Sequence, residues 1–306
     1  MAFIKLFSSV RLLHCETNFC RIVLRNCSAK SKAPAYNKNE DKAKTDKGSS
    51  GSESGQKGMV LGVYEDGDKF SLTPATEEVN QKSGGKLCQY LNELSRELKP
   101  GKSFVVTDVL ADGGCVALSS LGPQNPAHDP LEHLDEAKEN VRMGVGAGVS
   151  CLVARGIADI EVDCAGQPRA AAEGAHLAAW TFEKFKSPES QRGKARLSGL
   201  GGEKEWAVGV TLAESQNWAR YLSDMPANAM TPYDLAQEAL DVLCPLGVQV
   251  SVRDGGWAQA QGMEAFLAVA RGSAEPPLLL ECHYRGAGND PPVLLASPAL
   301  TFDRRR

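Results

Sequence analysis

The sequence has no HExxH pair, no nucleophile elbow around a serine and no phosphate-binding P-loop. Those patterns supply metal ligands, an activated hydroxyl or a phosphate cradle, so mechanisms that depend on them have no candidate residues here. No apolar run approaches the roughly 18 residues that are needed to cross a bilayer, which predicts a protein outside the membrane. Aromatic residues make up only 6% of the chain, but 42% hydrophobic and 24% charged residues are typical of a globular protein.

The nine cysteines never occur with the CxxC spacing of metal sites and redox pairs. Because their number is odd and they are scattered, we expect reduced thiols in an intracellular compartment rather than a disulfide framework.

Charge is distributed unevenly along the chain. The whole sequence carries a net charge of −4, but residues 1–35 contain six basic residues and one acidic residue, and this charge of +5 leaves −9 for the rest. An acidic body argues against a nucleic-acid partner, because phosphates must be met by a basic surface. A leader that is rich in arginine and poor in acids is typical of a mitochondrial transit peptide, so we expect the mitochondrial matrix. The alternatives are an untranslated upstream stretch and a cytoplasmic location.

The remaining chain divides by composition and periodicity. Residues 36–57 contain charge, serine and glycine but little that could be buried, which predicts a disordered tether. Residues 58–202 alternate strand-like and helical patterns, which favours an α/β domain with a mixed sheet and flanking helices. A linking helix is expected over 203–224, followed by the start of a second α/β domain over 225–306. In the first domain the expected strands are 59–64, 104–109, 115–121, 160–162 and 195–200, and the expected helices are 83–98, with Ser83 as its N-cap, 131–153 and 169–185.

The second domain is expected to open with a helix at Thr231, where a threonine cap is followed by proline. Apolar runs predict strands over 248–252, 278–284 and 293–296. Their partner strands would lie beyond residue 306, so we expect unpaired edges and poor solubility for 225–306.

Local motifs suggest no active site. Gly144, Gly146 and Gly148 superficially resemble a phosphate-binding loop, but they lie inside a helical pattern, which favours close helix packing. His128 and His133 would lie about 140° apart around a helix, which disfavours a metal site. A further pair of histidines, His176 in an alanine-rich helix and His283 in an apolar strand, has the surroundings of core histidines.

Three segments in order, 224–232, 270–284 and 300–303, closely resemble the leucyl (cytosol) aminopeptidase family, and weaker similarity extends back to about Met59. The resemblance implies a macro-like N-terminal domain, a linking helix and a zinc-peptidase-like catalytic domain, with subunits assembled as hexamers. Family members remove N-terminal residues, leucine among others, from peptides. Two divalent metals, zinc or manganese, generate the hydroxide and polarise the carbonyl in that family.

The family's metal site depends on a strand that reads Gly-Lys-Gly-(Ile/Leu)-Thr-Phe-Asp-Ser-Gly-Gly. Asp303 matches its aspartate ligand, but Pro298 stands at the lysine position, and proline has no amine that could bind a metal. Three arginines, residues 304–306, replace Ser-Gly-Gly and would oppose two nearby cations. The family's later Asn-Thr-Asp-Ala-Glu-Gly-Arg segment, with two further carboxylate ligands, does not occur. One vestigial ligand position therefore remains, so we expect neither a bound metal nor peptidase activity from this chain alone.

Two function classes remain open. In the first, the chain is a truncated or misspliced product of an active aminopeptidase, and peptides are partners only of the longer form. In the second, it is a non-catalytic subunit that joins aminopeptidase assemblies as a self or paralogue oligomer. A weaker third hypothesis, nucleotide binding by the macro-like domain, rests on fold analogy alone.

Overall fold

The computed structural model describes residues 2–5, 56–66, 69–94, 98–126, 135–286 and 291–300 of the chain. The chain forms two compact units, one of Ser50–Ser223 and one of Asp224–Arg306 with Met1–Ser49. No described helix is long and apolar enough to cross a membrane.

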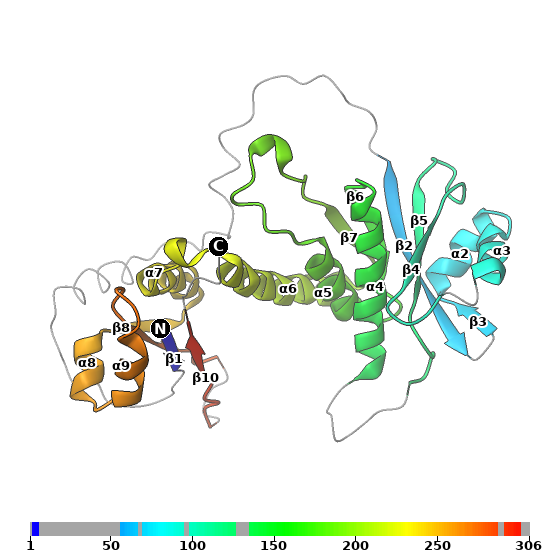
Figure 1. The fold of residues 1–306 in the computed structure, drawn as a ribbon. Coiled ribbons are helices and arrows are strands. Elements are labelled where there is room, and N and C mark those ends of the chain that lie inside the picture. Colours follow the sequence, from blue (N-terminus) through cyan, green and yellow to red (C-terminus); the bar gives the residue numbers. More distant parts are fainter. Residues whose placement is uncertain are drawn as a thin grey trace. The chain divides into compact units, whose positions relative to one another are not determined.

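The first unit is built on a mixed six-stranded sheet with the order β4-β5-β2-β6-β7, in which β3 pairs with β2 off this path (Figure 1). Strands β2, β5, β6 and β7 run parallel, whereas β4 is antiparallel to β5 and β3 is antiparallel to β2. The predicted mixed sheet is therefore confirmed. The bounds are β2 Lys57–Asp66, β3 Lys69–Leu72, β4 Ser103–Val106, β5 Cys115–Ser120, β6 Asp159–Asp163 and β7 Arg196–Leu200.

Helices cover both faces of this sheet, α4 and α5 on one and α2 and α3 on the other (Figure 1). Each face has its own hydrophobic core, with Leu152 fully buried in one and Leu87 in the other. All six residues of β5 are buried, as expected for a strand that is covered on both faces. The bounds are α2 Pro74–Lys82, α3 Lys86–Leu94, α4 Glu136–Ala154, α5 Pro168–Ala179, the short 3₁₀ helix Pro188–Ser190 and α6 Glu203–Asp224.

The predicted helix boundaries differ from the structure in several places. Ser83 is not an N-cap but the C-cap of α2, a helix that the sequence analysis missed. The reason for the miss is that α2 buries Thr76 and Asn80 rather than an apolar stripe, so it has no hydrophobic periodicity. Helix α4 begins after Asp135, whose side chain accepts a hydrogen bond from the Lys138 amide at 3.3 Å; the predicted start at 131 lies outside the described residues.

The helix that was predicted to reach Phe185 ends at Ala179. Trp180 adopts an extended backbone, and the Arg220 guanidinium on α6 lies 4.2 Å from the centre of its ring. The ring centre of Phe182 lies 5.9 Å from that of Tyr221, which is also on α6. Aromatic residues gain little from continuing a helix, so these contacts with α6 outweigh the helical pattern.

The second unit has a four-stranded sheet with the order β10-β1-β9-β8. Strand β1 runs parallel to β9, while β10 is antiparallel to β1 and β8 is antiparallel to β9. The bounds are β1 Ala2–Lys5, β8 Gln249–Arg253, β9 Leu278–His283, β10 Ala296–Ala299, α7 Pro232–Leu243, α8 Gly255–Ala260 and α9 Glu264–Ala270, with 3₁₀ turns at Ala227–Ala229 and Cys244–Leu246.

The expectation that these strands would find partners only beyond residue 306 is wrong. Strand β9 has β8 on one side and β1 on the other, so residues from the start of the chain pair with an edge that was expected to be free. The last strand begins at Ala296 rather than at Val293. Pro291 and Pro292 lie just before the apolar run and restrict its backbone, and the run itself is exposed.

The start of α7 is as predicted. The Thr231 hydroxyl accepts a hydrogen bond from the Asp234 amide at 3.3 Å, and the Asp234 carboxylate accepts one from the Thr231 amide at 2.9 Å. Pro232 occupies the first turn, where a missing N–H removes no helical bond. This capping box fixes where the helix of the second unit begins.

Candidate functional site

Of the two positions that match the family's metal site, only Pro298 lies within the described residues. Pro298 lies in β10, where its backbone is opposite Phe3 of β1. Asp303, the one predicted metal ligand, lies outside the described residues, as do His128 and His133. No side-chain donor therefore stands at the lysine position, because a proline ring offers none.

The described residues do not fit a dinuclear metal centre. In the parts of the chain that the structure describes, no group of three or more His, Cys, Asp or Glu side chains could hold a metal ion. A pair of divalent ions needs several oxygen or nitrogen ligands, and one carboxylate cannot supply them.

The two histidines that were expected in core-like positions lie there. His176 is half-buried on α5, and its ring lies 6.2 Å from that of Trp206 in an edge contact. Burial lowers the pKa of His176, so it is neutral at physiological pH. His283 is the last residue of β9.

The glycine pattern in α4 serves packing. A side chain at Gly144 would come within 2.7 Å of the Ser120 carbonyl oxygen, and one at Gly148 would come within 2.5 Å of Val60. Both glycines thus let α4 lie directly on the sheet, which confirms helix packing over a phosphate loop.

A buried polar cluster of the first unit is centred on the carboxylate of Asp163, at the end of β6. The side chain accepts hydrogen bonds from the Gly62 amide on β2 at 3.2 Å and from the Ala165 amide at 2.9 Å. It also accepts one from the hydroxyl of Thr73, the N-cap of α2. Thr76 completes the link by donating to the Gly62 carbonyl oxygen at 2.7 Å. This cluster was not predicted, because its members are distant in sequence and match no motif.

Asp163 also affects the groups beside it. Burial first, and the Asp163 charge second, raise the pKa of the Cys164 thiol to about 11. The same two causes raise the pKa of Tyr64. Cys164 is therefore a protonated, unreactive thiol near neutral pH, and the cluster has the properties of a structural rather than a catalytic group.

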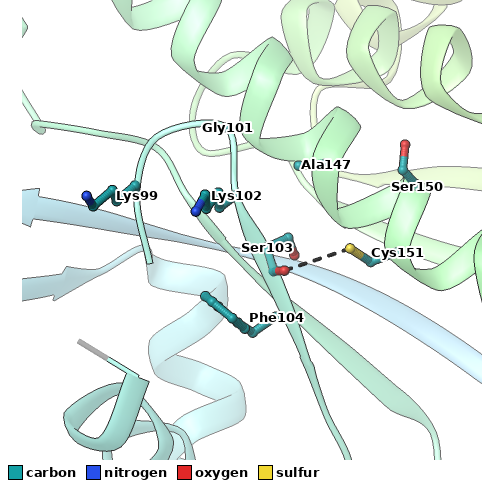
Figure 2. Close-up of a pocket in the computed structure, with 8 residues that line it drawn as sticks. All are labelled: Lys99, Gly101, Lys102, Ser103, Phe104, Ala147, Ser150 and Cys151. Carbon is teal, nitrogen blue, oxygen red and sulfur yellow. Dashed lines mark hydrogen bonds between the residues drawn. The ribbon is translucent and has the colours of Figure 1, made fainter. Parts of the chain in front are cut away.

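An open cavity of about 620 Å³ lies elsewhere in the same unit, between helix α4 and the chain that leads into β4. Figure 2 shows the lysines on the loop at one side and the serine and cysteine of α4 at the other. The Cys151 thiol donates a weak hydrogen bond to the Ser103 carbonyl oxygen at 3.8 Å. The cavity is lined by Lys99, Gly101 and Lys102 of the loop, Ser103 and Phe104 of β4, and Ala147, Ser150 and Cys151 of α4.

The fold is that of leucine aminopeptidase-like α/β proteins. A mutant of tomato leucine aminopeptidase aligns with a TM-score of 0.55 and 21% identity, covering 74% of this chain and 47% of that one. The bottromycin maturation enzyme BotP, solved in complex with Mn, aligns with a TM-score of 0.54 and 22% identity, covering 75% of this chain and 45% of that one.

Sequence comparison identifies the family. The model of the cytosol aminopeptidase family's N-terminal domain matches residues 60–189, and the model of its catalytic domain matches residues 217–304. Cytosol aminopeptidases of Sus scrofa and Homo sapiens are each 36% identical over 254 residues, which cover 81% of this chain and 49% of the relative. The chain belongs to the cytosol aminopeptidase family. It spans about half the length of these curated relatives.

Substituting Asp163→Asn should lower the free energy of unfolding by about 2 kcal/mol, because an amide nitrogen then faces a buried donor. The matched control is Asp159→Asn on the same strand, whose ion pair with Arg196 at 3.1 Å is exposed and should contribute under about 1 kcal/mol. Urea unfolding followed by circular dichroism measures both. Equal losses in the two variants would contradict a special role for the buried carboxylate.

Proposed function

We propose that this chain carries the N-terminal domain and the opening part of the catalytic domain of a leucyl aminopeptidase-type hydrolase, which removes N-terminal residues from peptides. The observation that carries this proposal is the match of both family domains in their usual order, over 60–189 and 217–304. The chemistry belongs to the whole protein, in which two divalent ions, zinc or manganese, would supply the activated water.

The 306 residues by themselves do not carry out this reaction. Pro298 cannot replace a lysine, and in the sequence three arginines, residues 304–306, stand where the family motif has Ser-Gly-Gly, so their charge would oppose two bound cations. Asp303 remains as a single vestigial ligand position. This chain is therefore either part of a longer active enzyme or a non-catalytic member of an aminopeptidase assembly.

The purified 306-residue chain should not hydrolyse a chromogenic leucine amide above the uncatalysed rate, with Zn²⁺ or Mn²⁺ present. Reading both the rate and the bound metal per chain after dialysis separates a missing metal from a missing catalytic group. Pro298→Lys should not restore turnover, because the other ligands are still lacking. Turnover that disappears in Asp303→Asn would overturn the proposal.

The second unit supports a proposal about partners. Val293, Leu294 and Leu295 expose 79%, 51% and 63% of their surface, which is unusual for three consecutive apolar side chains. Such a patch is typical of surfaces that are covered in an assembly. We propose that another aminopeptidase chain, a second copy or a paralogue, covers it, in keeping with the hexamers of the family.

Leu295→Glu should shift the chain towards smaller species and increase its soluble fraction, because a charge prevents burial of the apolar run. The control is Val208→Glu on α6, an apolar side chain that is 48% exposed in the first unit. Light scattering coupled to size exclusion at several concentrations measures the change. A wild-type chain that stays monomeric at every concentration contradicts the partner proposal.

We also propose mitochondrial import, which rests on the basic residues of 1–35. Residues 1–35 fused to a fluorescent protein should co-localise with a mitochondrial stain, whereas Arg11→Glu combined with Arg21→Glu should abolish this. A diffuse cytoplasmic signal from the unaltered fusion would favour the cytoplasmic alternative.

A further inference from the structure

Four hydroxyl side chains of this chain are followed directly by proline. They are Thr73, Ser187, Thr231 and Ser297. Proline restricts the residue before it to an extended backbone. The three that precede a helix or a 3₁₀ turn are extended, with φ from −58° to −69° and ψ from 148° to 168°. Because their backbones are alike, burial and hydrogen bonding decide which hydroxyl an external enzyme can reach.

Two of the four hydroxyls are committed to the fold. Thr73 is 1% exposed, and its hydroxyl donates to the Asp163 carboxylate. The Thr231 hydroxyl donates to the Asp234 carboxylate at 2.7 Å, within the capping box of α7. A phosphate on either oxygen would replace a donated hydrogen bond with repulsion between two negative charges. Both positions are therefore closed to modification in the folded chain.

Ser297 is exposed but lies within a strand. Its backbone is opposite Ile4 in the antiparallel pair of β10 and β1. A modifying enzyme must hold the acceptor segment in its own cleft, so this strand would first have to separate from its partner.

Ser187 differs from the other three because it lies in the segment 180–195, which contains no regular structure except the 3₁₀ turn Pro188–Ser190. Every residue from 184 to 194 is exposed. The Gln191 side chain donates to the carbonyl oxygens of Glu183 and Lys186, at 3.3 and 3.1 Å, and so holds the segment as a compact loop. Ser187 is thus presented at a surface where no part of the fold has to open.

The charges around Ser187 tolerate an added phosphate. Residues 184–194 contain four basic residues and one acidic residue, a net charge of +3 on a chain that carries −4. A phosphate of about −1.5 to −2 would lower this local charge. Lys186 precedes the acceptor directly, and its exposed ion pair with Glu183 at 2.9 Å is of the kind that contributes little to stability. Pairing of Lys186 with the phosphate instead would therefore cost the fold little.

We propose that Ser187 accepts a phosphoryl group from a proline-directed serine/threonine protein kinase. The Ser187 hydroxyl oxygen forms a bond to the γ-phosphorus of ATP, the bond from that phosphorus to the bridging oxygen breaks, and ADP leaves. The serine proton passes to the catalytic aspartate of the kinase. The acceptor lies within the first unit, and the proposal does not depend on peptide hydrolysis.

The test uses the full 306-residue chain, a purified mitogen-activated protein kinase and ATP, with each acceptor quantified by mass spectrometry of its peptide. Four synthetic peptides, one around each acceptor, give the rates without the fold. Ser187 should react in the chain within about threefold of its peptide, because it needs no local opening. Thr73 and Thr231 should react at least about a hundredfold more slowly than their peptides, because the fold must open first.

Ser187→Ala should remove the phosphate. The matched control is Ser190→Ala, a hydroxyl of the same loop that is followed by glutamine, and it should leave phosphorylation unchanged. Circular dichroism checks that both variants remain folded. Absence of phosphate on Ser187 in the folded chain would overturn the proposal. Equal slowing of Ser187 and Thr73 relative to their peptides would overturn the role of exposure, as would rapid modification of Thr231 in the chain.

Discussion

The carboxylate of Asp163 joins its own strand and the turn after it to two segments that are distant in the sequence, β2 and the start of α2. It bonds the Gly62 amide of the central strand β2, the hydroxyl that caps α2, and the turn that leads into α5. The strand order reverses between β2 and β6, which is where open α/β sheets commonly bind ligands beyond the carboxyl ends of their strands. Here both carboxylate oxygens are already occupied by the protein's own donors. The junction therefore closes that position and stabilises the sheet.

The sequence was sufficient to predict a strand or helix where the local pattern of residues and their burial in the fold agree. The central strands of the first sheet are short apolar runs, and the strand at 160–162 and the helix that begins at Thr231 were both recognisable from neighbouring residues alone. Prediction failed where contacts between distant segments decide the outcome. Helix α2 buries polar side chains, and α5 stops early because Trp180 contacts α6. Pairing of β9 with residues 2–5 could not be read from either segment.

The candidate sites also differ in whether the sequence alone could have predicted them. Pro298 could be compared with a family motif because that motif is continuous in sequence, and Asp303, although recognisable in the sequence, lies outside the described residues. The cavity beside α4 has no such signal, since its lysines and its α4 residues are about fifty positions apart and meet only through the sheet.

If residues 1–35 act as the transit peptide proposed above, strand β1 links their removal to the architecture of the second unit. It is the inner strand between β9 and β10, yet it lies within the 35 residues that an import protease would remove with a transit peptide. Its partner strands β9 and β10 follow far later in the sequence, so this part of the sheet can form only after the intervening residues have been synthesised. A processed chain would lack that strand, so precursor and mature protein would differ in topology as well as in length.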